Sequence, residues 1–167
     1  SRRLTPPHHA EEFVRRTLSQ AAALHETGDL PTARALAERA VADSPTSASR
    51  VQALLLLGFI EWDAGAVESV FEHMDQSLAA AGDDRDLQRD VCIEWVGLTR
   101  TLDPKRALEF AERAEAGDTD VEQAEFLLDR FWAEALLGRK PPLELLERGL
   151  DLEAVTGPKW PIPILWY

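Results

Sequence analysis

Cysteine, methionine and tyrosine are almost absent from this sequence, which has one of each among 167 residues. The single thiol, Cys92, excludes an internal disulfide and any site built from several cysteines, and it fits a reducing compartment such as the cytoplasm. No apolar stretch approaches the roughly 20 residues that a membrane-spanning helix needs. The longest one, residues 53–60, runs into Glu61. The sequence therefore predicts a cytoplasmic protein without a membrane partner.

Basic residues are also few. The sequence has 18 Lys and Arg against 30 Asp and Glu, which gives a formal net charge of −12. Affinity for nucleic acids comes largely from cationic side chains that neutralise phosphates. An acidic surface repels a phosphate backbone, so we expect no DNA or RNA binding by this segment. The hydrophobic content of 45% is ordinary for a globular protein and is enough to build a core without disulfides or metals.

The sequence lacks the usual motifs of catalysis. Its nine glycines are scattered and none precedes a Lys-Ser or Lys-Thr pair, so a phosphate-binding loop is missing. No His-Glu-x-x-His or Cys-x-x-Cys pattern provides a zinc site. Cys92 lies between Val91 and Ile93 in a predicted helix, where we expect it to be packed rather than nucleophilic. We therefore expect no enzyme activity, no catalytic residues, no metal site and no cofactor.

None of the four histidines pairs with another at the spacing of a metal site. His8 and His9 lie near the start of the sequence, where we expect them to be solvated. His25 lies near the predicted end of a helix, where the helix dipole favours a cation. His73, next to Glu72, is expected on an outer helix face. Each histidine therefore has a structural explanation.

Small residues recur in pairs seven apart, and the pairs begin 37 residues apart: Ala33 and Ala40, Val70 and Ser77, Ala107 and Ala114. Residues seven apart lie on the same face of a helix, where small side chains let a second helix approach closely. Gly28 and Gly65, about one turn before the first two pairs, suit the left-handed position that ends a helix. Asp29 and Asp103 are predicted N-caps, and Pro104 suits the first helical position.

These signals predict an all-α chain of about four helix pairs, with no strand. The apolar spacing is helical throughout, and the expected ranges are 9–27 with 31–44, 48–64 with 66–80, 85–101 with 104–116, and 120–137 with 142–153. Trp160, Trp166 and Tyr167 are expected to begin a fifth pair. We interpret residues 1–167 as one helical-repeat domain, cut from a longer protein.

The helix pairs resemble tetratricopeptide repeats, whose unit is about 34 residues. In the first repeat Gly28, Ala33, Ala40 and Pro45 fall at the matching offsets. The resemblance weakens along the chain, because Trp95 stands in the third repeat where that pattern usually has glycine. It implies an α-α superhelix in which the first helix of each pair lines a concave groove.

A narrower resemblance points to large ATP-binding transcriptional regulators of the LuxR type from actinobacteria. It is carried by the segments ETGDLPTARALAERA (26–40), AEALLGR (133–139) and LLERGLDLE (145–153). In those proteins an ATPase module and a helix-turn-helix flank a long helical-repeat region. The resemblance implies that this chain is the sensor and assembly segment, without the nucleotide-binding loop or the DNA-reading helix.

Transferring the inward-facing positions of the tetratricopeptide pattern onto this sequence gives the expected groove. The candidates are Arg15, Leu18, Gln52, Leu55, Phe59, Trp62, Arg89, Val96, Leu128 and Trp132. The set is more apolar and aromatic than a groove for a charged peptide tail needs. Phe59, Trp62 and Trp132 could form an amphipathic pocket for a small ligand or a partner helix, or they could fill the core between repeats.

Two functions follow as hypotheses. The first is a sensor or assembly segment of a transcriptional regulator that binds a small-molecule effector, a protein or an intramolecular partner. The second is a general protein-interaction scaffold with no link to transcription. Stacked repeats need polar caps, and neither end of the chain clearly has one, so the exposed edge could also pair in a homodimer.

Overall fold

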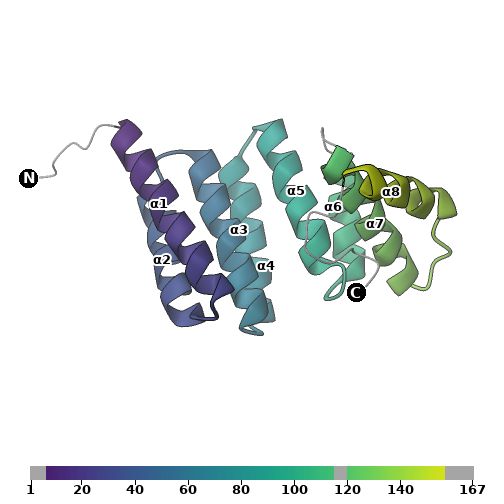
Figure 1. Ribbon diagram of the computed structural model, residues 1–167, viewed down its shortest axis with the longest axis horizontal. Helices are drawn as coiled ribbons and strands as arrows, with labels where there is room; N and C mark the ends of the chain where they lie inside the picture. Colours follow the sequence, from purple (N-terminus) through teal and green to yellow (C-terminus); the bar gives the residue numbers. More distant parts are fainter. Residues whose placement is uncertain (1–6, 115–119, 157–167) are drawn as a thin grey trace, which may run out of the picture. The chain divides into compact units, whose positions relative to one another are not determined.

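The computed structural model describes residues 7–114 and 120–156, and these form eight helices and no strand (Figure 1). The prediction of an all-α fold is confirmed. Each helix begins and ends within three residues of its expected bounds: α1 (Pro7–Glu26), α2 (Leu30–Asp43), α3 (Ser47–Asp63), α4 (Val67–Ala81), α5 (Arg85–Thr99), α6 (Pro104–Ala114), α7 (Asp120–Leu136) and α8 (Leu143–Thr156). The fifth pair, expected at Trp160, Trp166 and Tyr167, falls outside the described residues.

The chain divides into two compact units, an N-terminal unit of residues 1–87 and a C-terminal unit of residues 88–167. The boundary falls in the first turn of α5. The N-terminal unit contains α1 to α4, and the C-terminal unit contains most of α5 together with α6 to α8. In the described ranges no helix is both long and apolar enough to cross a bilayer.

Helix ends form where the sequence predicts them. Gly28 and Gly65 follow α1 and α3 with φ of 84° and 75°, a conformation that side chains with a Cβ rarely adopt. The N–H of Asp29 then donates to the carbonyl of Leu24 at 3.0 Å, which closes the last turn of α1. The Asp29 carboxylate in turn accepts from the N–H of Thr32 at 3.3 Å and caps α2. One glycine-aspartate turn therefore ends the first helix and starts the second.

Small side chains bring the helices of the N-terminal unit together. Ala33, Ala37 and Ala40 of α2 are completely buried, and Ala33 and Ala37 pack with Leu57 and Ile60 of α3. Helix α2 contacts both α1 and α3, α3 contacts α4, and α1 also contacts α3, as Figure 1 shows for these four neighbouring helices. The Ala33 and Ala40 positions identified in the sequence thus form the helix-packing face.

The C-terminal unit is built in the same way, with α7 packed against both α6 and α8. Ala107 of α6 is fully buried and forms a cluster with Leu108 and Ala133, so the third small-residue pair also begins on a packing face. On α8 the backbone comes close to α7 at Gly149. A Cβ added there would lie 2.8 Å from Cγ of Leu128, a fully buried residue of α7.

We predict that Gly149→Ala destabilises the protein by about 1 kcal/mol. Overpacking against Leu128 costs about 1–3 kcal/mol, which outweighs the gain of about 1 kcal/mol from the better helix former. Urea unfolding followed by circular dichroism measures the change. Glu147→Ala, an exposed position on the same helix, should change stability by less than about 0.5 kcal/mol. A stabilised Gly149→Ala variant would show that α8 does not approach Leu128 this closely.

Candidate functional site

The groove candidates of the N-terminal unit lie on α1 and α3. Arg15 and Gln52 are exposed, and four apolar candidates are partly buried: Leu18, Leu55, Phe59 and Trp62. Leu18 packs against a core cluster of Val14, Ala40 and Ala53. These apolar side chains therefore belong in part to the packing of the helices, and each also keeps some surface that a partner can reach.

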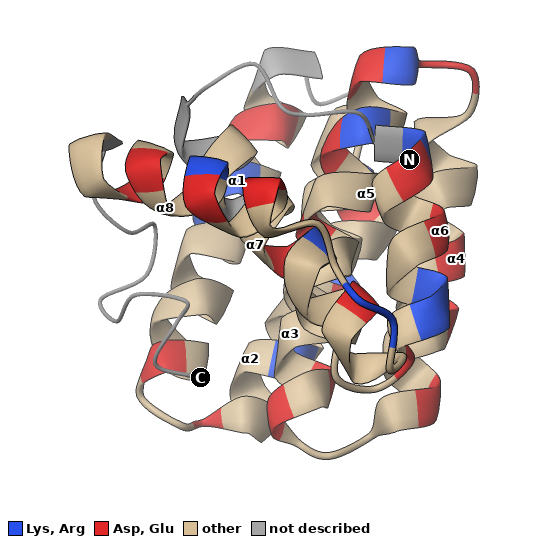
Figure 2. Cartoon of the chain, turned by 90° about the vertical axis from the view of Figure 1, so that its right-hand side faces the viewer, with Lys and Arg blue, Asp and Glu red and all other residues tan. Residues whose placement is uncertain are grey.

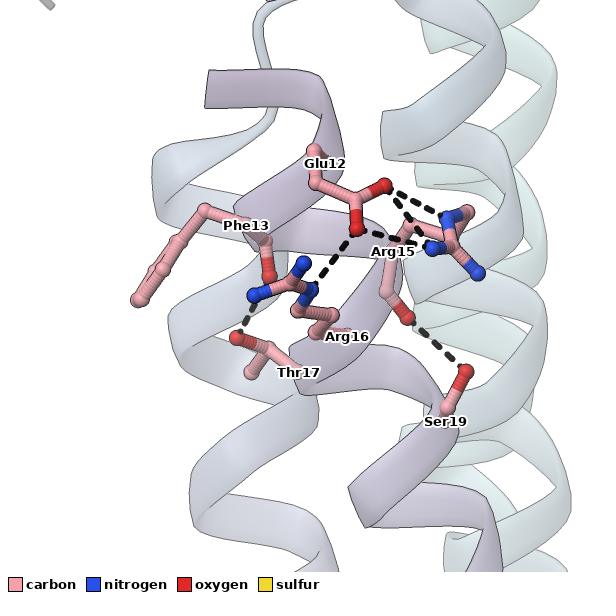
Figure 3. Close-up of polar contacts among 6 residues, drawn as sticks. All are labelled: Glu12, Phe13, Arg15, Arg16, Thr17 and Ser19. Carbon is pink, nitrogen blue, oxygen red and sulfur yellow. Dashed lines mark hydrogen bonds and ion pairs between the residues drawn. The ribbon is translucent and has the colours of Figure 1, made fainter. Parts of the chain in front are cut away.

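Arg15 belongs to an exposed charge cluster at the start of α1 (Figure 3). Glu12 accepts hydrogen bonds from Nε of Arg15 at 2.9 Å and from Nε of Arg16 at 2.7 Å. The hydrogen bond from Arg15, followed by that from Arg16, holds the pKa of Glu12 below its ordinary value. Because all three side chains face solvent, this cluster contributes little to stability.

The candidates of the C-terminal unit separate into buried and accessible residues. Val96 and Leu128 have no exposed surface, so their expected place in an open groove is wrong and both are core residues. Arg89 is partly buried and pairs with Asp90 at 3.2 Å. Trp132, in contrast, lines a pocket. Of the four candidates in this unit, Trp132 has the clearest access to a ligand.

The pocket around Trp132 has a volume of about 110 Å³ and is lined by Arg100, Thr101, Trp132 and Leu136. Arg100 and Thr101 lie in the turn between α5 and α6, whereas Trp132 and Leu136 are four residues apart on α7. Leu136 is half exposed. The lining residues therefore carry a guanidinium and a hydroxyl in the turn, and an indole and an aliphatic side chain on α7.

Arg100 is held in place by a buried carboxylate. Its Nη1 donates to Oδ1 of Asp129 at 2.7 Å and to the carbonyl of Gly97 at 2.8 Å. The Asp129 side chain is only 2% exposed, and that of Arg100 is 18% exposed. A Cβ at Gly97 would lie 2.8 Å from Oδ2 of Asp129, so glycine leaves the room that the carboxylate needs. Asp129 and Gly97 thus position Arg100 at the pocket.

A second polar cluster lies in the N-terminal unit. Glu61 of α3 is 1% exposed, and Nη2 of Arg34 lies 2.8 Å from Oε1 of Glu61. The two groups form an ion pair, but Oε1 of Glu61 accepts no hydrogen bond. Nε2 of His73 is 4.0 Å from the same oxygen. Separately, Nε2 of His25 and Oδ2 of Asp63 are 2.6 Å apart. The expected outer-face position of His73 is therefore wrong, because this side chain faces a buried carboxylate.

Sequence reasoning missed this cluster although the sequence contained a signal. Glu61 is four residues after Leu57 and seven after Leu54, so helical spacing places it on the same buried face. His73 likewise lies three residues after Val70, which is fully buried. A charged residue in phase with buried leucines indicates a buried charge that needs a partner.

We predict that Arg34→Ala destabilises the protein by about 2 kcal/mol. Removing one partner of a fully buried pair costs about 3–5 kcal/mol, and the half-exposed Arg34 side chain reduces that figure. The matched control is Arg16→Ala, which removes an exposed partner of Glu12 and should leave the stability almost unchanged. Chemical unfolding of both variants compares them. Equal effects would contradict the role of Glu61 as a buried charge.

Cys92 shows no sign of activation as a nucleophile. It is buried as a free thiol on α5, and burial raises its pKa, an effect that the Arg113 charge only partly offsets. A thiol with a raised pKa carries little thiolate near neutral pH. Among the described residues no group of three or more His, Cys, Asp and Glu side chains is arranged to hold a metal ion.

Comparison with known proteins gives no relative for this chain, since no protein family, no curated protein and no solved structure matches it.

Proposed function

We propose that this chain is a binding module without catalytic activity, built as a superhelix of tetratricopeptide-like helix pairs. Three repeated features support the proposal: glycines with positive φ after α1, α3 and α7, small buried residues on the second helices, and contacts between successive helices from α1 to α4 and from α6 to α8. In such repeats the side chains left on the surface bind the partner.

The observation that carries the binding role is the pocket at Trp132. It joins an apolar wall to a fixed cation, and a few convergent polar groups in an apolar hollow are what ligand sites generally have. The partly buried Phe59 and Trp62 of α3 supply further apolar surface in the N-terminal unit. A net charge of −12 supports a ligand or partner other than nucleic acid.

The biological setting that fits best is the cytoplasmic sensor or assembly segment of a LuxR-type regulator. The segment would bind a small effector or a protein partner while other parts of the protein hydrolyse ATP and bind DNA. This setting rests on the resemblance of residues 26–40 and 133–153. The alternative, a general protein-interaction scaffold, would have the same fold as the regulator segment. The two hypotheses differ in the protein domains that flank this segment.

The coding sequence on both sides of this segment tests the setting. The regulator hypothesis predicts a phosphate-binding loop on the N-terminal side and a helix-turn-helix on the C-terminal side. If neither is encoded there, the regulator hypothesis is wrong and the scaffold replaces it. The result does not bear on the pocket, which is tested separately.

A further inference from the structure

The pocket at Trp132 has the chemistry of a carboxylate site. A guanidinium matches the planar geometry of a carboxylate, with two parallel N–H groups that pair with its two oxygens. Thr101, which lines the same pocket, carries a hydroxyl that can donate. Trp132 and Leu136 offer no charge and favour an alkyl chain. Together these walls suit a molecule with a carboxylate at one end and a short apolar chain at the other.

The guanidinium is oriented before any ligand arrives. Both hydrogen bonds described for Arg100, to Asp129 and to the carbonyl of Gly97, are made by Nη1. The edge formed by Nε and Nη2 is therefore the part that can meet a carboxylate. Because Asp129 is almost fully buried and close to Gly97, the arginine does not have to lose much freedom on binding.

The sequence around the pocket is basic although the whole chain is acidic. Residues 97–106 contain Arg100, Lys105 and Arg106 against the single acid Asp103, and residues 135–143 contain Arg139 and Lys140 with no acid. With residues 129–134 included, which add Asp129, Arg130 and Glu134, these stretches contain six basic and three acidic residues, and 6 − 3 leaves three positive charges. Figure 2 shows Asp and Glu spread over the helices, with Lys and Arg among them. This local excess favours an anion.

The volume sets the size of the ligand. About 110 Å³ is well below the roughly 300–1,000 Å³ of pockets for drug-sized molecules. A pocket of this size suits a small ligand, such as a carboxylate with a few carbons. A dicarboxylate would bring its second charge against Trp132 and Leu136, so a monocarboxylate fits better.

We propose that this pocket binds a short-chain organic monocarboxylate. Its carboxylate accepts hydrogen bonds from Nε and Nη2 of Arg100 and from the Thr101 hydroxyl, and its alkyl chain packs on Trp132 and Leu136. The inference rests on the proposed function, because it names the effector class of a sensor segment. A ligand with so few atoms binds with a dissociation constant of about 1 mM, in the range of abundant metabolites.

Titration of the whole chain with sodium butyrate tests the proposal, with the indole N–H signal of Trp132 followed by NMR at constant ionic strength. We expect a saturable shift with a dissociation constant of about 1 mM. Butyramide, with the same shape and no charge, should bind at least about 10-fold more weakly, and butylammonium should not bind. A shift that sodium chloride reproduces, or equal binding of the amide, would overturn the proposal.

Two variants and a matched control locate the site. Leu136→Asp introduces a carboxylate at a half-exposed position and should abolish the shift without unfolding the chain, whereas Leu143→Asp, at another exposed leucine, should bind as the parent does. Arg100→Lys keeps the charge beside Asp129, loses the planar fork and should weaken binding about 10-fold. Undiminished binding by Leu136→Asp would place the ligand elsewhere. If butyrate does not bind, the proposed ligand class is wrong. The regulator hypothesis is tested separately, by the sequence that flanks this segment.

Discussion

Replacing Arg100 with methionine is expected to destabilise the C-terminal unit by about 3 kcal/mol, because it leaves Asp129 buried without the cation that pairs with it. The two side chains are 18% and 2% exposed, so little water can take over the role of the guanidinium. Breaking buried pairs in this way costs about 3–5 kcal/mol, and the partial exposure of Arg100 puts the expected loss at the lower end. Urea unfolding followed by circular dichroism measures it.

The double variant Arg100→Met/Asp129→Leu sharpens this test. It removes both charges, so we expect it to be more stable than Arg100→Met alone by about 1–2 kcal/mol. Arg139→Met removes an exposed arginine that pairs with Glu134 and should cost less than about 0.5 kcal/mol. If the double variant is less stable than the single one, Asp129 is stabilised by its surroundings independently of Arg100, and the account of how Arg100 is positioned fails.

Trp95→Ala is expected to lower the free energy of unfolding by about 4 kcal/mol, since deleting a buried aromatic leaves a large cavity. Trp95 is 1% exposed, and its carbonyl accepts from the Thr99 hydroxyl at 2.6 Å. It stands where the tetratricopeptide pattern usually has glycine, so in this chain the position is filled by a large core side chain. Trp95→Phe retains most of the volume and should lose about half as much.

The control for Trp95 is Val155→Ala in the same unit. Val155 is 84% exposed, so its truncation should change stability by less than about 0.5 kcal/mol. Thermal or chemical unfolding of the three variants gives the comparison. A Trp95→Ala variant as stable as Val155→Ala would mean that α5 does not pack through this residue.

Among the described residues the number, bounds and turns of the helices were predictable because local sequence determines them. Gly28, Asp29 and Pro104 act through backbone conformation and hydrogen bonds within a few residues, and the structure has each of them where it was expected. Ala33 and Ala40 were identifiable because helix packing repeats every second turn. The division of the chain into two units depends on contacts between distant residues, and the sequence pattern carried no sign of it.

The site was predictable only in part. Trp132, one of the groove candidates, lines a pocket, whereas Leu128, one turn earlier on the same helix, is completely buried. Successive helix residues are rotated by about 100°, so a register error of one residue moves a side chain from the groove to the core. That register came from the tetratricopeptide pattern, which matches least well in the third and fourth pairs. Val96 was misplaced in the same way.

The polar residues around Trp132 were not predicted at all. Arg100 and Thr101 come from a turn, and the tetratricopeptide pattern assigns groove positions to helices alone. Asp129 had a signal comparable to that of Glu61, because it follows the apolar run Phe126, Leu127 and Leu128 and precedes the buried Ala133 by one turn. The sequence could not identify Arg100 as the partner of Asp129, because the two residues are 29 positions apart in the chain.

The central claim is that this chain binds a ligand through the pocket at Trp132, and a thermal-shift screen against a panel of small metabolites tests it most directly. A ligand that binds only the folded state raises the melting temperature, by an amount that grows with the logarithm of its concentration relative to its dissociation constant. We predict at least one compound that stabilises the parent chain and Trp62→Leu but leaves Trp132→Leu unchanged. If no compound stabilises the folded parent, or if Trp132→Leu responds as strongly as the parent does, the claim is contradicted.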